Sequence, residues 1–176
     1  MSTQAIPESG MIFGPYPEGQ CFHIERSECY SQVQEGVQMA EFLLLRHSEG
    51  VAPCVWVVEA KSSCPRKLDG YMEDIRAKLT NGFLLGLAAC LGRHPAASEE
   101  LPQAFKALDA RETTFRFVLV VNGVPDEYLP ELQSSLALKL RPLLKTWALP
   151  PVSVAVLNPG RAQKHGLIQP SAPAAP

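Results

Sequence analysis

The chain of 176 residues contains no run of roughly 18 or more uncharged apolar residues, the length that a membrane-spanning helix requires. Its longest apolar stretch, from Phe83 to Leu91, is interrupted by Gly86 and is too short to cross a bilayer. The first 19 residues also lack the basic start and the sustained apolar segment of a secretory signal peptide. We therefore expect a protein that does not contact membranes and that resides in the cytoplasm.

Several signatures of common protein classes are also missing. The five cysteines form no CxxC pair, which argues against a disulfide framework or a zinc ribbon. The chain has neither a glycine-rich phosphate loop nor a GxSxG turn, which disfavours a nucleotide hydrolase, a dinucleotide enzyme and a serine hydrolase. A net charge of −2 argues against a strong nonspecific nucleic-acid binder, although a local basic patch stays open.

The hydrophobic pattern predicts one domain over residues 20–168, between an N-terminal arm of irregular structure (residues 1–19) and a disordered Pro/Ala-rich tail (residues 169–176). Strands are expected over residues 20–30, 37–46, 54–63, 115–121 and 152–157. Helices are expected over residues 71–91, around residues 99–108, and from a cap at Asp126, with Pro142 kinking or ending the last one.

The connections between these elements predict the topology of the sheet. Short turns join the first three strands, so these should form an antiparallel meander. Each later strand follows a helix and should pair in parallel with its predecessor through a right-handed crossover. The expected architecture is α/β, with a mixed central β-sheet, an antiparallel three-strand meander followed by βαβ units, flanked by helices. Gly82 and Gly86 should let the first long helix approach this sheet closely.

The most apolar strand of the chain ends in charged residues. The run at residues 55–58 is followed directly by Glu59, Ala60 and Lys61, and the period of a strand places Glu59 and Lys61 on one face. Glu41 interrupts the preceding apolar strand, and an antiparallel hairpin would bring it opposite the neighbourhood of Glu59. Two carboxylates beside one lysine repel each other unless a cation lies between them, and such oxygen-rich sites suit Mg²⁺ or Mn²⁺.

An acidic residue on one strand, followed by a strand that ends in Glu–x–Lys, resembles the PD-(D/E)XK nuclease superfamily over roughly residues 20–125. The resemblance implies a restriction-endonuclease-like fold. It also implies that the chain is a divergent member of this superfamily, a nuclease that acts on DNA or RNA. It also implies that Glu41, Glu59 and the carbonyl of Ala60 hold Mg²⁺ or Mn²⁺, while Lys61 orients or activates the attacking water. In this family a further acid can come from a preceding helix, and here Glu25 or Glu28 would have to supply it.

Three other interpretations stay open at this level. The glutamates and the lysine could form a purely structural ion pair at a strand end. The chain could also be a catalytically inactive nuclease-like domain that binds a protein or nucleic-acid partner, since a fold does not fix a function. Its apolar helices could instead mediate self-association, for example as a homodimer.

The remaining polar and aromatic residues carry weaker predictions. Four basic residues are candidate phosphate contacts: Arg66, Lys67, Arg161 and Lys164. The sequence gives His23, His47 and His94 no metal-ligand spacing, so they are expected to be surface or turn residues. The two tryptophans, Trp56 and Trp147, are expected in the core.

Overall fold

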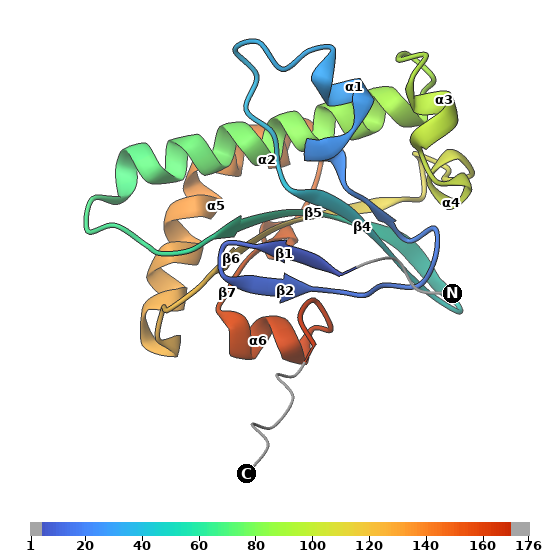
Figure 1. Cartoon of the computed structure of the whole chain (residues 1–176). Coiled ribbons are helices and arrows are strands. Elements are labelled where there is room, and N and C mark those ends of the chain that lie inside the picture. The colour runs from blue at the N-terminus through green and yellow to red at the C-terminus, as the bar shows by residue number, and fades with distance from the viewer. Residues whose placement is uncertain (1–4, 170–176) are drawn as a thin grey trace.

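The computed structural model describes residues 5–169 and confirms the α/β fold with a mixed central sheet (Figure 1). Five strands lie in the order β3-β4-β5-β6-β7, with the first two pairings antiparallel and the last two parallel. Two further strands, β1 and β2, form a separate hairpin. The strands are β1 (Ile6–Glu8), β2 (Met11–Phe13), β3 (Cys21–Phe22), β4 (Phe42–Ser48), β5 (Val51–Lys61), β6 (Thr114–Val121) and β7 (Val154–Leu157).

Two long helices account for most of the helical structure. The α-helices are α1 (Glu28–Ser31), α2 (Leu68–Cys90), α3 (Ala97–Glu100), α4 (Gln103–Lys106), α5 (Leu129–Thr146) and α6 (Pro159–Lys164). Short 3-10 turns are η1 (Ile24–Arg26), η2 (Asp126–Tyr128) and η3 (Pro151–Ser153). Within residues 5–169 no helix combines the length and the apolar character needed to cross a membrane.

The sheet has a hydrophobic layer on each face. Helices α2 and α5 cover one face, and the β1-β2 hairpin with α6 covers the other (Figure 1). Strand β5 contributes to both layers, because Val55 and Val57 pack toward α2 whereas Trp56 and Val58 pack toward the hairpin. This burial on both faces explains why β5 is a nearly continuous run of apolar residues.

Two glycines of α2 set how closely this helix approaches the sheet. A Cβ atom at Gly82 would lie 2.8 Å from the Cβ of Ala40, and one at Gly86 would lie 2.5 Å from Cδ1 of Leu43. Larger residues would therefore push α2 away from the start of β4. The close approach predicted for these glycines is confirmed. It places the turn of α2 that precedes Gly82 over Glu41, the residue after Ala40.

The N-terminal third of the chain differs from the sequence prediction. The arm expected over residues 1–19 contains the β1-β2 hairpin, whose buried side chains Ile6, Met11 and Phe13 complete one layer of the core. Residues 20–30 are extended only at β3, and the chain then turns through η1 and α1. Ser27 lies between η1 and α1, and its side chain caps α1, with Oγ accepting from the Tyr30 N–H. Strand β4 likewise begins at Phe42 rather than at residue 37.

Of the two outcomes expected at Pro142, a kink or the end of α5, the end is wrong, and so is the cap expected at Asp126. The helix runs through Pro142 to Thr146 instead of ending at the proline. Pro142 has no N–H to donate to the carbonyl of Leu138. Both residues lie on the exposed face of α5, where water can donate to this carbonyl instead. Asp126 does not cap the helix, since its carboxylate accepts hydrogen bonds from Asn158 and Arg161. The tail predicted to be disordered lies, from residue 170 onward, outside the described residues.

Candidate functional site

Glu41 and Glu59 lie side by side where β4 begins and β5 ends. Phe42 pairs with Val58 in the antiparallel register, and the N–H of Glu41 donates to the carbonyl of Val58 over 3.0 Å. Glu41 and Glu59 are the residues that come directly beyond this last pair of the ladder, so the two acids are neighbours, as the hairpin predicts. Both side chains point into the layer under α2, where Glu59 is 0% and Glu41 only 3% exposed. Two carboxylates this deeply buried require cationic partners or a bound ion.

Two lysines supply positive charge to these carboxylates. Lys61 follows two residues after Glu59 on the same face of β5, and its Nζ lies 2.8 Å from Oε1 of Glu59. Lys78, from α2, lies between the two acids, with its Nζ 3.0 Å from Oε1 of Glu59 and 3.8 Å from Oε1 of Glu41. The cation that sequence reasoning required between two carboxylates is therefore present, at least in part, as an ammonium group.

The sequence analysis did not identify Lys78 as a candidate site residue. Lys78 lies three residues after Ile75 and four before Gly82, both of which are buried against the sheet. Residues at these spacings share one helix face. The signal that could have identified Lys78 was a single charge on the otherwise apolar stripe of the helix.

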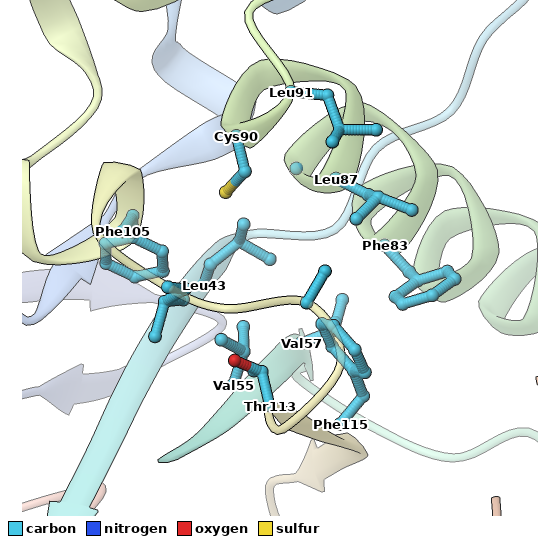
Figure 2. Close-up of a pocket in the computed structure, with 13 residues that line it drawn as sticks. Leu43, Val55, Val57, Phe83, Leu87, Cys90, Leu91, Phe105, Thr113 and Phe115 are labelled. Atoms are coloured by element: carbon cyan, nitrogen blue, oxygen red, sulfur yellow. The ribbon is translucent and has the colours of Figure 1, made fainter.

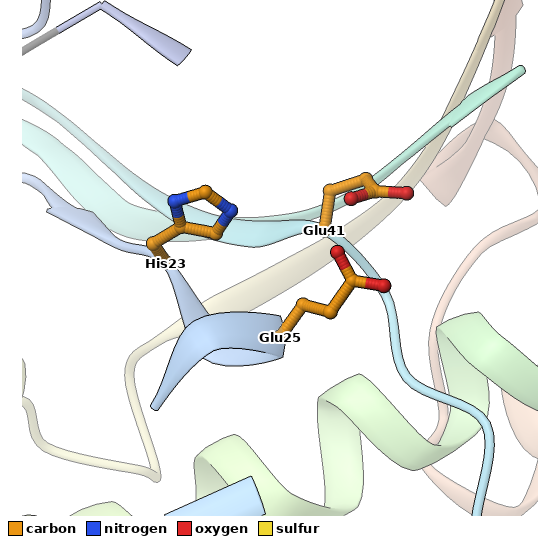
Figure 3. Close-up of side chains that lie close together, drawn as sticks. All are labelled: His23, Glu25 and Glu41. Carbon is orange, nitrogen blue, oxygen red and sulfur yellow. The ribbon is translucent and has the colours of Figure 1, made fainter. Parts of the chain in front are cut away.

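A third carboxylate and an imidazole lie next to Glu41. The turn η1 carries Glu25, whose backbone N–H donates to the carbonyl of Glu41 over 3.3 Å. One ligand atom from each of His23, Glu25 and Glu41 lies within 4.8 Å of the others (Figure 3). Glu25 therefore joins the cluster, whereas Glu28 has an exposed side chain on α1 and does not. His23, expected to be an isolated surface residue, is instead half-buried beside two acids.

The environment of Glu41 strongly favours its protonated form. Burial, a hydrogen bond with Glu25 and repulsion from Glu59 raise the pKa of Glu41 to about 9. Burial also raises the pKa of Glu59, although Lys61 and Lys78 oppose this shift. For Lys78 burial acts to lower the pKa, but the attraction of Glu59 outweighs it and the pKa is raised. The pKa of His23 is lowered, mainly by burial, which keeps its imidazole neutral and able to act as a ligand.

The raised pKa of Glu41 predicts a protein that loses stability as the pH rises. The pKa of this carboxyl is higher in the folded than in the unfolded state, so folding is favoured when the carboxyl is protonated. This contribution to stability is fully present below the unfolded pKa of about 4.3, and it is lost as the pH rises toward the folded pKa of about 9. In EDTA, we expect the free energy of unfolding to fall by up to about 1.4 kcal/mol per pH unit in this window. Denaturant titrations between about pH 5 and 9 measure the slope.

The variant Glu41→Gln should flatten this pH dependence, because glutamine does not titrate. The exposed Glu127 provides a control, and Glu127→Gln should follow the wild type. Equal slopes for the wild type and Glu41→Gln would contradict the assignment.

The donor set of the cluster fits a divalent cation. The Oε2 atoms of Glu41 and Glu59 and the Nε2 atom of His23 are buried and make no hydrogen bond within residues 5–169. Carboxylate oxygens suit Mg²⁺ or Mn²⁺, and an imidazole nitrogen shifts the preference toward Mn²⁺. Ala60 could contribute only its carbonyl, because its methyl group packs into the opposite layer.

A cavity of about 560 Å³ opens beside this cluster, at the carboxyl ends of β5 and β6. Its wall begins at Ser62, directly after Lys61, and includes Arg66, so the strand ends lead from the ion pairs to an open space. Lys67 follows as the residue before α2. The residues that line the cavity begin after Lys61, whose own side chain is 27% exposed.

The other two candidate phosphate contacts lie elsewhere. Arg161 and Lys164 belong to α6, on the face of the sheet opposite Glu59. Arg161 is held by Asp126, to which its Nε and Nη2 donate. These two residues therefore do not join the carboxylate cluster.

A second, apolar pocket lies between α2 and the sheet, toward the other end of β5 (Figure 2). It encloses about 50 Å³ and is lined mainly by aliphatic and aromatic side chains such as Phe83, Phe105 and Phe115. Its side-chain polar groups are those of Cys90 and Thr113. None of the described residues that line it carries a charge.

Comparisons of the chain with protein-family models, with curated proteins and with solved structures find no match. The functional interpretation therefore depends on the geometry of the cluster.

Proposed function

We propose that the chain is a divalent-metal-dependent phosphodiester hydrolase, a nuclease acting on DNA or RNA, with a restriction-endonuclease-like fold. One observation carries the proposal: ligand atoms of His23, Glu25 and Glu41 lie within 4.8 Å of one another. Lys78 contacts both Glu41 and Glu59, which places the Glu59–Lys61 pair beside this group. The acid before β4 and the Glu–x–Lys end of β5 have the arrangement that the PD-(D/E)XK resemblance implies.

In this proposal Glu41 and Glu59 hold the ion with the Ala60 carbonyl, and Glu25 and His23 add ligands beside Glu41. The ion would supply Lewis-acid stabilisation of the charge that develops on the phosphodiester. Lys61, anchored by Glu59, orients the attacking water. Lys78 favours the ionised form of Glu59 against the effect of burial, and it contacts both acids.

The position of Lys78 also supports a second candidate function. Its ammonium already contacts Glu41 and Glu59, so an ion must share these carboxylates with a lysine or displace it. A nuclease-like domain that binds a protein or nucleic-acid partner without cleaving it needs no such exchange. In this alternative the two glutamates and two lysines form a structural network.

Calorimetric titration of Mn²⁺ into the purified, EDTA-treated protein separates these functions. We expect the wild type to bind Mn²⁺, and Glu41→Gln and Glu59→Gln to bind at least about tenfold more weakly, because each removes a charged ligand. The exposed Glu127 again provides the control, since Glu127→Gln should bind as the wild type does. If the folded wild type bound no Mn²⁺, or if both ligand variants bound it normally, the metal-dependent function would be wrong.

A further inference from the structure

A cluster of positive charge lies on the face of the sheet that α6 covers, away from the carboxylates. The guanidinium carbons of Arg46 and Arg116 lie 5.1 and 5.0 Å from the centre of the Trp56 ring. The ring of His165, at the end of α6, lies 6.0 Å from the same ring. Trp56 was expected to be a core residue, and it is buried, but its ring also gathers three basic side chains.

The basic side chains differ in how well they are paired. Arg46 is fixed, because its Nη2 donates to the carbonyls of His165 and Gly166 over 2.7 and 3.1 Å. The half-buried Arg116 makes no ion pair with the other described residues, and its buried Nε has no hydrogen-bond partner. A guanidinium that is partly removed from water without an anion is costly, and a bound anion would remove that cost.

Arg116 and His165 border a cavity of about 320 Å³ beside β7, the edge strand of the sheet. Arg116 and Arg161 supply its positive charges, His165 adds an imidazole and Gln133 adds an amide. The cavity is lined by no aspartate or glutamate among the described residues. Its remaining wall is apolar and comes from β7 and the start of α5.

The electrostatics of His165 point to the same excess of positive charge. Its pKa is lowered by burial and then by the neighbouring charges of Arg116, Arg46 and Arg161. Asp126 pairs with Arg161, with its Oδ2 3.0 Å from Nη2 of the arginine. The cluster therefore retains more positive charge than its own carboxylate neutralises.

We propose that this cavity is a binding site for a phosphate group, held by Arg116 and Arg161 with His165 beside them. Guanidinium groups match phosphate oxygens in pairs and are more weakly hydrated than ammonium groups, so arginine suits this role. The apolar wall and the volume leave room for the organic part of a phosphorylated compound, such as a nucleotide. The phosphate could belong to a free small molecule or to the end of a nucleic-acid chain.

This site is separate from the proposed metal centre. Trp56 and Arg116 face α6, whereas Glu59 and Lys61 face α2, so the sheet lies between the two. Binding of phosphate here does not require that the chain be a nuclease, and variants of the two sites can be tested independently.

Calorimetry with three probes tests the proposal: inorganic phosphate, a 5′-phosphorylated dinucleotide and the same dinucleotide without the phosphate. Binding of phosphate alone supports a small-molecule source, and binding of only the phosphorylated dinucleotide supports a nucleic-acid end. We expect the dinucleotide without phosphate to bind at least about tenfold more weakly than its phosphorylated form. The proposal would be overturned if neither phosphate probe bound to the wild type.

Variants assign the binding to this cavity. Arg116→Gln should weaken phosphate binding about tenfold, and Asp126→Asn should strengthen it by a few-fold, because a competing carboxylate is removed. Arg141→Gln, on the exposed face of α5, should bind as the wild type does. If Arg116→Gln does not fold, Arg161→Gln replaces it. Equal binding by the arginine variant and the Arg141→Gln control would show that the anion binds elsewhere.

Discussion

Replacement of Lys78 by methionine should lower the free energy of unfolding by about 3 kcal/mol at neutral pH. The substitution keeps most of the apolar stem of the side chain but removes the ammonium that lies 3.0 Å from Glu59 and 3.8 Å from Glu41. Glu59 is fully buried, so it cannot replace this partner with water. The expected loss lies at the lower end of the range for breaking a buried ion pair, because Lys61 still contacts Glu59.

Denaturant unfolding of the wild type, Lys78→Met and Lys139→Met measures this effect. Lys139 also bridges two acids, Asp69 and Glu73, but its pairs lie at the surface, so Lys139→Met should unfold close to the wild type. The difference in the free energy of unfolding between the wild type and Lys78→Met should become smaller toward pH 5, because protonation of Glu59 removes the negative charge that Lys78 balances. A Lys78→Met protein as stable as the Lys139→Met control would mean that this network contributes little.

The half of the candidate site that lies on neighbouring strands could be predicted from the sequence. The period of a strand places Glu59 and Lys61 on one face, and a short turn forces β4 and β5 into an antiparallel hairpin. Together these local rules bring Glu41 beside Glu59 without any knowledge of the tertiary fold. The same rules predicted the order and direction of the strands in the central sheet.

The other half depends on contacts that local rules do not describe. Lys78 reaches the carboxylates because Gly82 lets α2 lie against Ala40, and this is a long-range packing contact. His23 and Glu25 reach Glu41 because the chain leaves β3 after two residues and turns back over the start of β4. Ser27 closes that turn, because its N–H and its Oγ both donate to the carbonyl of Ile24, and the extended pattern of residues 20–30 concealed it.

The network of lysines also changes how the Glu–x–Lys pattern should be interpreted. Two buried carboxylates do not by themselves indicate a metal, because ammonium groups can balance them, as Lys61 and Lys78 do here. The features that still favour an ion are the unpaired Oε2 atoms and the third acid with its imidazole. A binding measurement and an activity measurement are therefore both needed.

Replacement of Lys61 by methionine should reduce metal-dependent cleavage by about a thousandfold, because it removes the group that orients the attacking water. Lys61 is partly exposed and Glu59 keeps a second partner in Lys78, so the fold should survive the change. Glu59→Gln should reduce cleavage to a similar extent, since it weakens a metal ligand and releases Lys61.

The measurement is a cleavage assay with Mg²⁺ or Mn²⁺ on four substrates: single- and double-stranded DNA and RNA, each closed or end-labelled to distinguish internal from terminal cuts. Lys145→Met, on the exposed face of α5, is the matched control and should cleave as the wild type does. If the wild type binds Mn²⁺ but cleaves none of these substrates, the cluster is a metal site without phosphodiesterase activity. If Lys61→Met cleaves as fast as Lys145→Met, Lys61 has no part in the reaction, and the resemblance on which its role depends does not extend to the chemistry.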